Sequence, residues 1–416
     1  MRNSGFLWIV AVAMALLDFY VFQIVKLLTQ GTSHRSRTMI FSAYWTLSIL
    51  AVLLLLLLPV IQSDRWPRHL RNYVFATLVG LFFAKLLAAV FFLIDDIRRL
   101  IQWAAGKIFF RNTEGANEVS AGISRSLFLS WLGIGVGGTL FSSLIYGFSN
   151  KYNYHIRRVP LSFAHLPAGF KGLKIVQVSD IHSGSFTNKR AVEKGVQMIL
   201  DLKPDIILFT GDLINDRATE MDDYIDVFSK LTAPMGVYST LGNHDYGDYV
   251  RWPNAEAKIQ NLERLKKLEI DMGWRLLMNE HVVLERGGDQ IALIGIENWS
   301  AKSSFPKYGR MDEAYPGAEK YAFKILMSHD PSHWDAEVRP RYGDIDLMLA
   351  GHTHGMRFGV EIPGFKWSPV QYVYKQWAGL YEEGKQKLYV NRGYGFIGYP
   401  GRVGILPEIT LIELNG

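Results

Sequence analysis

The sequence of 416 residues contains no cysteine. This absence excludes disulfide bonds, thiol nucleophiles and thiolate metal sites, and a domain of a few hundred residues buries enough apolar surface to fold without cross-links. Carboxylates and imidazoles are the chief side-chain metal ligands that remain. The chain has 39 Asp and Glu residues and 11 His residues to supply them.

Charged residues are scarce in four long apolar stretches in the first part of the chain. These are Phe6–Leu28, Met39–Ile61, Asn72–Ile94 and Leu127–Gly147. Each reaches roughly the 20 residues that a membrane helix needs. The alternative is a soluble bundle, but the second stretch contains six consecutive leucines, Leu53–Leu58, which a two-sided soluble helix does not expose. We predict four transmembrane helices over residues 1–148 and an integral location in a bacterial cell membrane.

Two charged residues, Asp18 and Lys85, lie well inside the apolar stretches, whereas Lys26 lies two residues from the end of the first. A charge inside a membrane is costly unless it is paired, so the two side chains are candidates for an ion pair between helices. The alternative is that each lies near enough to a helix end to reach the membrane interface.

Basic residues are not concentrated in the second part of the chain. Residues 1–170 hold 16 Lys+Arg and 6 Asp+Glu, which leaves 45 − 16 = 29 basic and 39 − 6 = 33 acidic residues, a net charge of 29 − 33 = −4. The positive charge therefore flanks the membrane stretches, as expected beside anionic headgroups. Because no Lys and Arg cluster interleaved with aromatic residues follows, we expect no nucleic-acid partner.

The orientation in the membrane depends on weak signals. Lys and Arg are nearly balanced between the two sides of the predicted helices, so their distribution decides nothing. The segment Ser124-Arg125-Ser126-Leu127-Phe128-Leu129 looks like a decayed twin-arginine export signal, which favours an extracytoplasmic location for the part of the chain that follows the fourth helix. Residues 149–170, with Pro160 and Pro167, predict an extended linker that holds the following domain, 171–416, close to the bilayer.

Five short strings carry metal-ligand chemistry in this second part. Each follows an apolar, β-branched run that is typical of a strand, such as 173–178 or 206–210, so the ligands leave strand ends into loops. Glycines beside them allow sharp turns. The strings are Asp180-Ile181-His182, Gly211-Asp212, Gly242-Asn243-His244-Asp245, His329 and Gly351-His352-Thr353-His354. Any one of them alone would be better interpreted as core histidines or capping aspartates, but the five in order indicate a site for two divalent cations.

The order of these strings resembles the calcineurin-like metallophosphoesterase superfamily over Lys171–Gly416. The resemblance implies that Asp180, His182 and His354 hold one metal ion. It implies that Asn243, His329 and His352 hold the other, and that Asp212 bridges the two. His244 would be a catalytic histidine that binds no metal.

Two cations about 3.5–4 Å apart would acidify a water between them, and the bridging hydroxide would attack phosphorus in line. His244 would offset the developing charge or protonate the leaving oxygen. Some relatives orient this histidine with an acidic residue three positions after the Gly-Asp pair, where this chain has Asn215. The partner of His244 is therefore open, and Asp245 either shapes the loop or serves that role.

The coarse pattern alternates strands with helices near 188–202, 219–231 and 255–270, and then becomes rich in strands. The predicted strands are 173–178, 206–210, 236–241, 290–296, 322–328, 345–350, 387–391 and 408–414. We predict an α/β fold, a four-layer αββα sandwich preceded by the four transmembrane helices, which is also the layering that the resemblance implies.

An aromatic insert, 355–404, begins directly after His354. Its rings have three interpretations: they grip an apolar or sugar-like group, rest at the headgroup level of a bilayer, or pack against the flank of the sandwich. Arg357 would contact a substrate phosphate or form a surface ion pair. Arg402 and Glu408 are expected to form a structural ion pair. The aromatic residues are Phe358, Phe365, Trp367, Tyr372, Tyr374, Trp377 and Tyr381.

These observations predict a membrane-anchored hydrolase that cleaves a phosphomonoester or phosphodiester at or near the membrane, with lipid-linked and envelope phosphates as candidate substrates. We expect two divalent metal ions as cofactors, with Mn²⁺ preferred and Fe or Zn²⁺ as alternatives. Two other functions fit the same sequence. The domain is either a phosphate-binding sensor or scaffold with little catalysis, or the output domain of a transmembrane sensor.

Overall fold

The computed structural model describes residues 4–57, 66–109 and 125–416. The chain divides into two compact units, Met1–Tyr146 and Gly147–Gly416. Each unit has hydrophobic clusters of its own.

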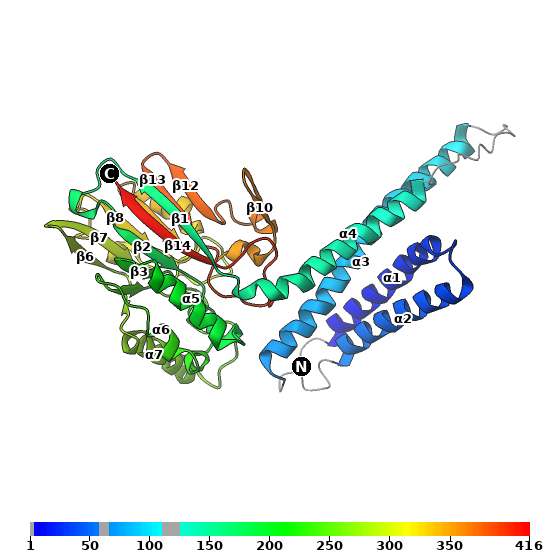
Figure 1. The fold of residues 1–416 in the computed structure, drawn as a ribbon, viewed down its shortest axis with the longest axis horizontal. Helices are drawn as coiled ribbons and strands as arrows, with labels where there is room; N and C mark the ends of the chain where they lie inside the picture. Colours follow the sequence, from blue (N-terminus) through cyan, green and yellow to red (C-terminus); the bar gives the residue numbers. More distant parts are fainter. Residues whose placement is uncertain (1–3, 58–65, 110–124) are drawn as a thin grey trace. The chain divides into compact units, whose positions relative to one another are not determined.

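The first unit contains four long helices, which are blue to cyan-green in Figure 1. They are α1 (Ser4–Leu28), α2 (His34–Leu57), α3 (Arg68–Phe109) and α4 (Arg125–Gly147). All four are long and apolar enough to cross a membrane, which confirms the four predicted spans. The predicted end of the second span, Ile61, lies outside the described residues.

The two intramembrane charges meet. The Lys85 ammonium pairs with the Asp18 carboxylate and donates a hydrogen bond to Ser48 Oγ at 2.8 Å. The Tyr44 hydroxyl donates to the main-chain oxygen of Asp18 at 2.7 Å. The pair predicted as one of two alternatives therefore forms, and it joins α1, α2 and α3 through buried polar contacts.

The second unit is built on two six-stranded sheets (Figure 1). The first has the order β1-β14-β2-β3-β4-β5 and the second the order β12-β13-β9-β8-β7-β6. The strands of the first sheet are β1 (His155–Ser162), β2 (Lys174–Val178), β3 (Ile206–Phe209), β4 (Val237–Ser239), β5 (Arg275–Leu276) and β14 (Glu408–Asn415). Those of the second are β6 (Glu280–Arg286), β7 (Asp289–Gly295), β8 (Lys324–Met327), β9 (Leu347–Ala350), β12 (Gly379–Glu383) and β13 (Gln386–Val390).

The core lies between the two sheets and on both outer faces. Side chains such as Ile175 and Leu208 from the first sheet pack with Leu293 and Ile325 from the second. The central strands are buried along their length, as expected for parallel strands covered on both faces. The predicted α/β sandwich preceded by membrane helices is therefore confirmed.

Helices cover the outer faces of the sheets. α5 (Lys189–Asp201) begins at Asn188, whose side chain accepts a hydrogen bond from the Ala191 N–H at 3.1 Å, and it buries Val192, Val196 and Ile199 against the first sheet. α7 (Ala255–Asp271) lies on the same side, and the short α8 (Met311–Ala314) and the π-helical turn Trp334–Val338 cover the second sheet.

Two segments differ from the sequence-based prediction. The expected helix near 219–231 is split into a 3-10 turn, Ala218–Met221, and α6 (Ile225–Phe228), because the chain leaves the helical conformation at Tyr224. The segment expected to be an extended linker contains β1, which pairs in parallel with the whole of β14. Pro160 is tolerated within β1 because β1 is an edge strand, and Pro167 lies beyond the strand, before the 3-10 turn Ala168–Phe170.

Candidate metal centre

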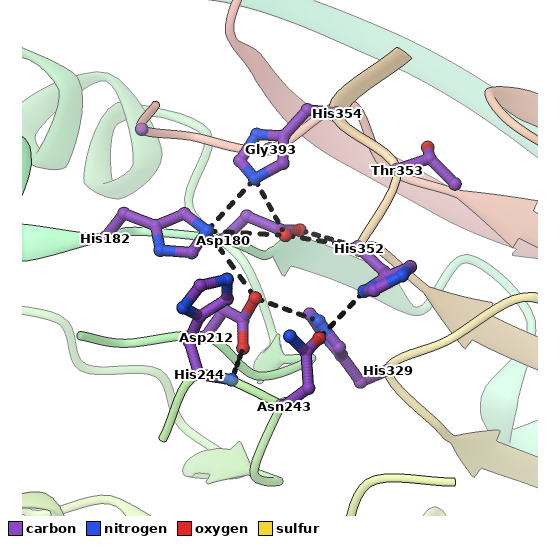
Figure 2. Close-up of polar contacts among 12 residues, drawn as sticks. Asp180, His182, Asp212, Asn243, His244, His329, His352, Thr353, His354 and Gly393 are labelled. Carbon is purple, nitrogen blue, oxygen red and sulfur yellow. Dashed lines mark hydrogen bonds and ion pairs between the residues drawn. The ribbon is translucent and has the colours of Figure 1, made fainter. Parts of the chain in front are cut away.

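The predicted site residues lie where strands of both sheets end. Asp180 and His182 follow β2, Asp212 follows β3, and Asn243 follows β4. His329 follows β8, and both His352 and His354 follow β9. Because β2, β3 and β4 run parallel to one another, as do β8 and β9, their carboxyl ends bring all seven side chains together (Figure 2).

The backbone of this site is strained. Asp180, His182, Asp212, His352 and His354 all have φ between +48° and +68°. Such conformations cost about 1–3 kcal/mol each and persist only where the surroundings enforce them. This concentration of left-handed residues at adjacent strand ends is typical of a functional site.

Two glycines are required by close approach rather than by their φ angle. A Cβ atom on Gly351 would lie 1.9 Å from Ser179 Oγ and 2.3 Å from Asp180 Oδ2. A Cβ atom on Gly242 would lie 2.2 Å from Asp212 Oδ1. Only Gly211, with φ +94°, has the sharp-turn conformation that the sequence predicts for the glycines of these three strings.

The first group of ligand-type side chains consists of Asp180, His182 and His354, all buried. Its three ligand atoms lie within 4.8 Å of one another. His354 Nε2 is 3.1 Å from Asp180 Oδ1 and 3.0 Å from His182 Nε2. Two imidazole nitrogens that face each other hold at most one proton between them, so this arrangement suits a cation that accepts both lone pairs.

The second group consists of Asp212, His329 and His352, again with ligand atoms within 4.8 Å of one another. His329 Nε2 is 3.1 Å from Asp212 Oδ2, and its Nδ1 donates to the Thr210 main-chain oxygen at 2.6 Å. His352 Nδ1 lies 2.8 Å from Asn243 Oδ1, which brings the predicted amide ligand into the group. A backbone acceptor on the far ring nitrogen is how ligating histidines are commonly oriented.

Asp212 lies between the two groups. Its Oδ2 atom is 3.5 Å from His182 Nε2 on one side and 3.1 Å from His329 Nε2 on the other. Figure 2 shows this carboxylate in the middle of the converging side chains. One carboxylate shared by two groups of imidazoles is the arrangement that two adjacent cations require.

The protonation of the imidazoles fits metal binding. Burial lowers the pKa of His182 and of His352, and it lowers the pKa of His354 to about 4, so these rings are neutral at pH 7 and offer free lone pairs. Burial also acts on His329, but the Asp212 carboxylate overrides it and raises the pKa of His329 to about 10. A divalent cation replaces that proton with a larger charge.

His244 is oriented by the backbone. Its Nδ1–H donates to the main-chain oxygen of Asn215 at 2.7 Å, and its own main-chain N–H donates to Asp212 Oδ1 at 2.8 Å. The partner of His244, which the sequence left open, is therefore the main-chain carbonyl of residue 215, a group that any residue type supplies. Because a carbonyl only accepts, Nδ1 carries a proton and Nε2 is the nitrogen left for chemistry.

Asp245 is a loop-forming residue, one of the two roles that the sequence left open. Its carboxylate accepts hydrogen bonds from the N–H groups of Gly242, Asp212, Leu213 and Ile214, at 2.8, 2.8, 2.8 and 3.2 Å. It thereby ties the loop after β3 to the loop after β4.

Tyr374 of the insert reaches the site and was missed as a site residue. Its hydroxyl is 2.8 Å from His352 Nε2 and donates to Asp330 Oδ2 at 3.2 Å. Phe305 packs edge-on against the same imidazole, with ring centroids 4.7 Å apart. The only sequence signal was the density of aromatic residues after His354, which does not say which ring turns inward.

Two arginines lie close to the first group. Arg402 is fully buried and donates to the main-chain oxygens of Arg392, Gly393 and Gly395, so the predicted Arg402–Glu408 pair is wrong. Glu408 pairs with Arg392 instead, at 2.5 Å. The fold brings Arg392, which follows β13, closer to the Glu408 carboxylate than Arg402. The local sequence carries no information about this proximity.

Arg357 follows His354 by three residues and has φ +57°. Its buried Nε and Nη1 atoms have no hydrogen-bond partner among the residues that the structure describes. Burial lowers the pKa of Arg357 to about 10, and the Asp180 carboxylate opposes that shift. A guanidinium still carries its charge at this pKa, so the site holds an unsatisfied cationic donor.

Comparison with known proteins identifies two family matches. Residues 173–356 match the family described as calcineurin-like phosphoesterase, and residues 1–151 match the family described as probable calcineurin-like phosphoesterase, transmembrane domain. The two matches reach both units, and residues 357–416 lie outside them.

Three curated proteins illustrate the range of similar chains. A transmembrane protein with metallophosphoesterase domain from Danio rerio is 28% identical over 74% of this chain and 67% of its own length. Phosphodiesterase YaeI from Escherichia coli is 29% identical over 58% of this chain and 82% of its own length. UDP-2,3-diacylglucosamine pyrophosphatase LpxG from Chlamydia muridarum is 26% identical over 57% and 81%, respectively.

Proposed function

Because this chain belongs to the calcineurin-like metallophosphoesterase superfamily and is a metal-dependent hydrolase of that class, we propose that it cleaves a phosphomonoester or phosphodiester with two divalent metal ions. The observation that carries this proposal is the Asp212 carboxylate, which lies within 3.5 Å of imidazole nitrogens of both ligand groups. Mn²⁺ is the preferred metal, and Fe and Zn²⁺ suit the same oxygen and nitrogen ligands.

The proposed ligands divide as the family resemblance implies. Asp180, His182 and His354 would hold one ion, while Asn243, His329 and His352 would hold the other, with Asp212 shared by both. Two bound ions would supply an acidified water as nucleophile and would offset charge on the phosphoryl oxygens. The fold holds these ligand side chains in place, because each ligand residue is either buried or has a left-handed backbone conformation that its surroundings enforce.

His244 is proposed as the proton donor to the leaving oxygen. The Asn215 carbonyl holds Nδ1 and the Asp212 carboxylate holds the main-chain N–H, so the ring has one orientation and its Nε2 atom stays free to carry the transferred proton. A donor fixed in this way needs no reorganisation when charge develops on the leaving group.

Arg357 is proposed to bind a non-bridging phosphoryl oxygen of the substrate. It lies in the turn that follows His354, and two of its buried nitrogen atoms lack a partner among the described residues. A non-bridging phosphoryl oxygen would satisfy those donors, and the planar guanidinium would fix the orientation of the phosphoryl group. The relatives named phosphodiesterase and pyrophosphatase support a substrate whose phosphate is joined through oxygen to a further group. The membrane helices support a substrate that is found at the membrane.

The test is hydrolysis of bis(p-nitrophenyl) phosphate and p-nitrophenyl phosphate by the full-length protein in detergent, with Mn²⁺ and after treatment with a chelator. Turnover that disappears with the chelator and returns with metal supports the proposal, and the ratio of the two rates gives the ester preference. A folded, metal-loaded protein that cleaves neither ester would favour the phosphate-binding sensor or scaffold, or the sensor output domain, instead.

A further inference from the structure

The hairpin in the insert has its polar and apolar faces reversed. It consists of β10 (Val360–Ile362) and β11 (Phe365–Trp367), which pair antiparallel with Glu361 opposite Lys366. These two charged side chains turn toward the body of the unit. The Glu361 carboxylate pairs with Arg157 at 2.9 Å and Arg392 at 2.6 Å, and the Lys366 ammonium donates to the Ala378 main-chain oxygen at 2.6 Å.

The opposite face of the hairpin is apolar and exposed. Ile362 is 58% exposed and Phe365 54%, and these two residues face each other across the Pro363-Gly364 turn. The following turn adds Tyr372, which is 76% exposed, and Val373. We call this surface the insert face, and it consists of Met356, Val360, Ile362, Phe365, Tyr372 and Val373.

This arrangement, with charged side chains turned inward and apolar side chains exposed, is the reverse of the one that is stable in water. A two-stranded hairpin on a soluble surface buries its apolar face and exposes its charges. Here the charges are already paired inside, so the insert face presents no unpaired carboxylate from the hairpin. Exposed apolar side chains gathered in one short segment of the chain indicate a surface that is covered in the working protein, and a face without repelling negative charge suits an anionic bilayer.

The base of the insert is tied to the residue at which the catalytic unit begins. Gly147, the first residue of this unit, belongs to the last candidate span, Ser126–Tyr152. Its main-chain oxygen accepts a hydrogen bond from the Arg402 N–H at 2.9 Å. The next residue, Val403, donates to the Arg357 main-chain oxygen at 2.8 Å and accepts from the Gly359 N–H at 2.9 Å. One hydrogen-bonded segment thus links Gly147, where the catalytic unit begins, to the start of the insert face.

The insert face also adjoins the metal centre. Tyr374 contacts His352 at 2.8 Å and follows exposed Tyr372 and Val373 directly. At the other end, Arg357 with its unpartnered nitrogens follows exposed Met356. A molecule held at the insert face therefore has its polar end within reach of the site residues.

We propose that the insert face docks on the lipid bilayer that anchors the chain, with its apolar side chains at the boundary between headgroups and acyl chains. An aromatic ring beside aliphatic side chains suits that depth. A consequence, which rests on the proposed function, is that the substrate is an amphipathic phosphoester whose apolar part stays in the bilayer while its phosphate reaches the metal centre.

Docking is tested without reference to activity. Because the chain has no cysteine, Ile362→Cys and Ile259→Cys each give the full-length protein a single site for an environment-sensitive fluorophore. Ile259 is a matched control, since it is 61% exposed on α7. In nanodiscs, docking predicts that a spin-labelled lipid quenches the label at 362 and leaves the label at 259 unaffected.

Equal, weak quenching at both positions would overturn the proposal. So would a label at 362 that is shielded from an aqueous quencher but not quenched by lipid, because that result assigns the face to a second copy of the chain or to another protein.

The consequence for the substrate has its own measurement. The double variant Ile362→Ser with Phe365→Ser is compared with Ile259→Ser with Ile270→Ser, both in vesicles. Hydrolysis of hexadecyl p-nitrophenyl phosphate in the bilayer should fall about tenfold only in the first variant, while that of soluble bis(p-nitrophenyl) phosphate should be unchanged. Equal rates on the lipid ester would refute the consequence. Failure of the wild type on both esters would refute the proposed function and leave the fluorescence result intact.

Discussion

The Nδ1–H of His244 donates a hydrogen bond of 2.7 Å to the main-chain oxygen of Asn215. The acceptor is part of the backbone, so the orientation of this imidazole does not depend on which side chain stands at position 215. The loop after β3, in which Asn215 lies, is in turn held by the carboxylate of Asp245. The geometry of the proposed proton donor is therefore a property of two tied loops.

Because the acceptor is a main-chain oxygen, substitutions of Asn215 and of His244 should have different effects on activity. Asn215→Ala keeps the carbonyl and loses only the bond from its amide to Ser185 Oγ, so we expect activity within about threefold of the wild type. His244→Ala should lower kcat by about 10²–10⁴-fold. The control is His155→Ala, since His155 is an exposed histidine. Steady-state hydrolysis of bis(p-nitrophenyl) phosphate distinguishes them. An Asn215→Ala loss as large as that of His244→Ala would show that the side chain is needed.

Asp245→Asn should reduce metal affinity although Asp245 is not a proposed ligand. An amide replaces one acceptor oxygen with a donor that faces the N–H groups of Gly242, Asp212 or Leu213. We expect metal affinity to fall about 10–100-fold, measured by Mn²⁺ titration of activity. Asp223→Asn, at an exposed position, serves as the control. Unchanged affinity in the Asp245 variant would contradict its loop-forming role.

Arg357→Lys should raise KM for the phosphodiester with a smaller change in kcat. Lysine keeps the charge but loses the planar pair of donors that would hold a phosphoryl oxygen, so we expect a rise in KM of about tenfold. The control is Arg341→Lys, whose side chain is 62% exposed and paired with Glu337. A KM equal to that of the wild type would remove Arg357 from substrate binding.

Glu269, a buried residue of α7 that is not a proposed metal ligand, gives a pH-dependent stability. This buried carboxyl accepts a hydrogen bond from Ser239 Oγ, and burial raises its pKa to about 8. The folded state therefore holds a proton that the unfolded chain releases near its ordinary pKa, so the free energy of unfolding decreases as pH rises between about 4.5 and 8.

Replacing this carboxyl with an amide should remove that dependence. Glu269→Gln is expected to be more stable than the wild type at alkaline pH, by on the order of a few kcal/mol, and to flatten the dependence of thermal unfolding on pH. The control is Glu263→Gln, since the Glu263 side chain is 62% exposed. An unfolding profile for Glu269→Gln that still falls with pH like that of the wild type would assign the dependence to other groups.

The sequence predicted the parts of the structure that depend on local pattern. Apolar runs located the four membrane helices and the central strands, and the family resemblance, which the comparisons confirm, came from strings such as Gly351-His352-Thr353-His354. Each string lies next to a strand end. The order of the strings along the chain therefore indicates which side chains meet at the site.

The remaining features depend on contacts between distant segments. Residues 149–170 were expected to be a linker because their prolines and mixed composition hide an edge strand, β1, that is defined only by its partner, β14. Tyr374 and Tyr372 belong to one aromatic cluster, yet one touches His352 and the other is exposed. Local composition is the same for both residues, and only the fold of the insert distinguishes them.

The sharing of Asp212 by two metal ions is tested by the metal content of the full-length protein after loading with Mn²⁺ and dialysis. We predict two ions per chain in the wild type and in Asp223→Asn, and fewer than two in Asp212→Asn, together with a loss of hydrolysis of at least about 10²-fold. An Asp212→Asn protein that retains two ions and normal turnover would show that Asp212 is not a shared ligand.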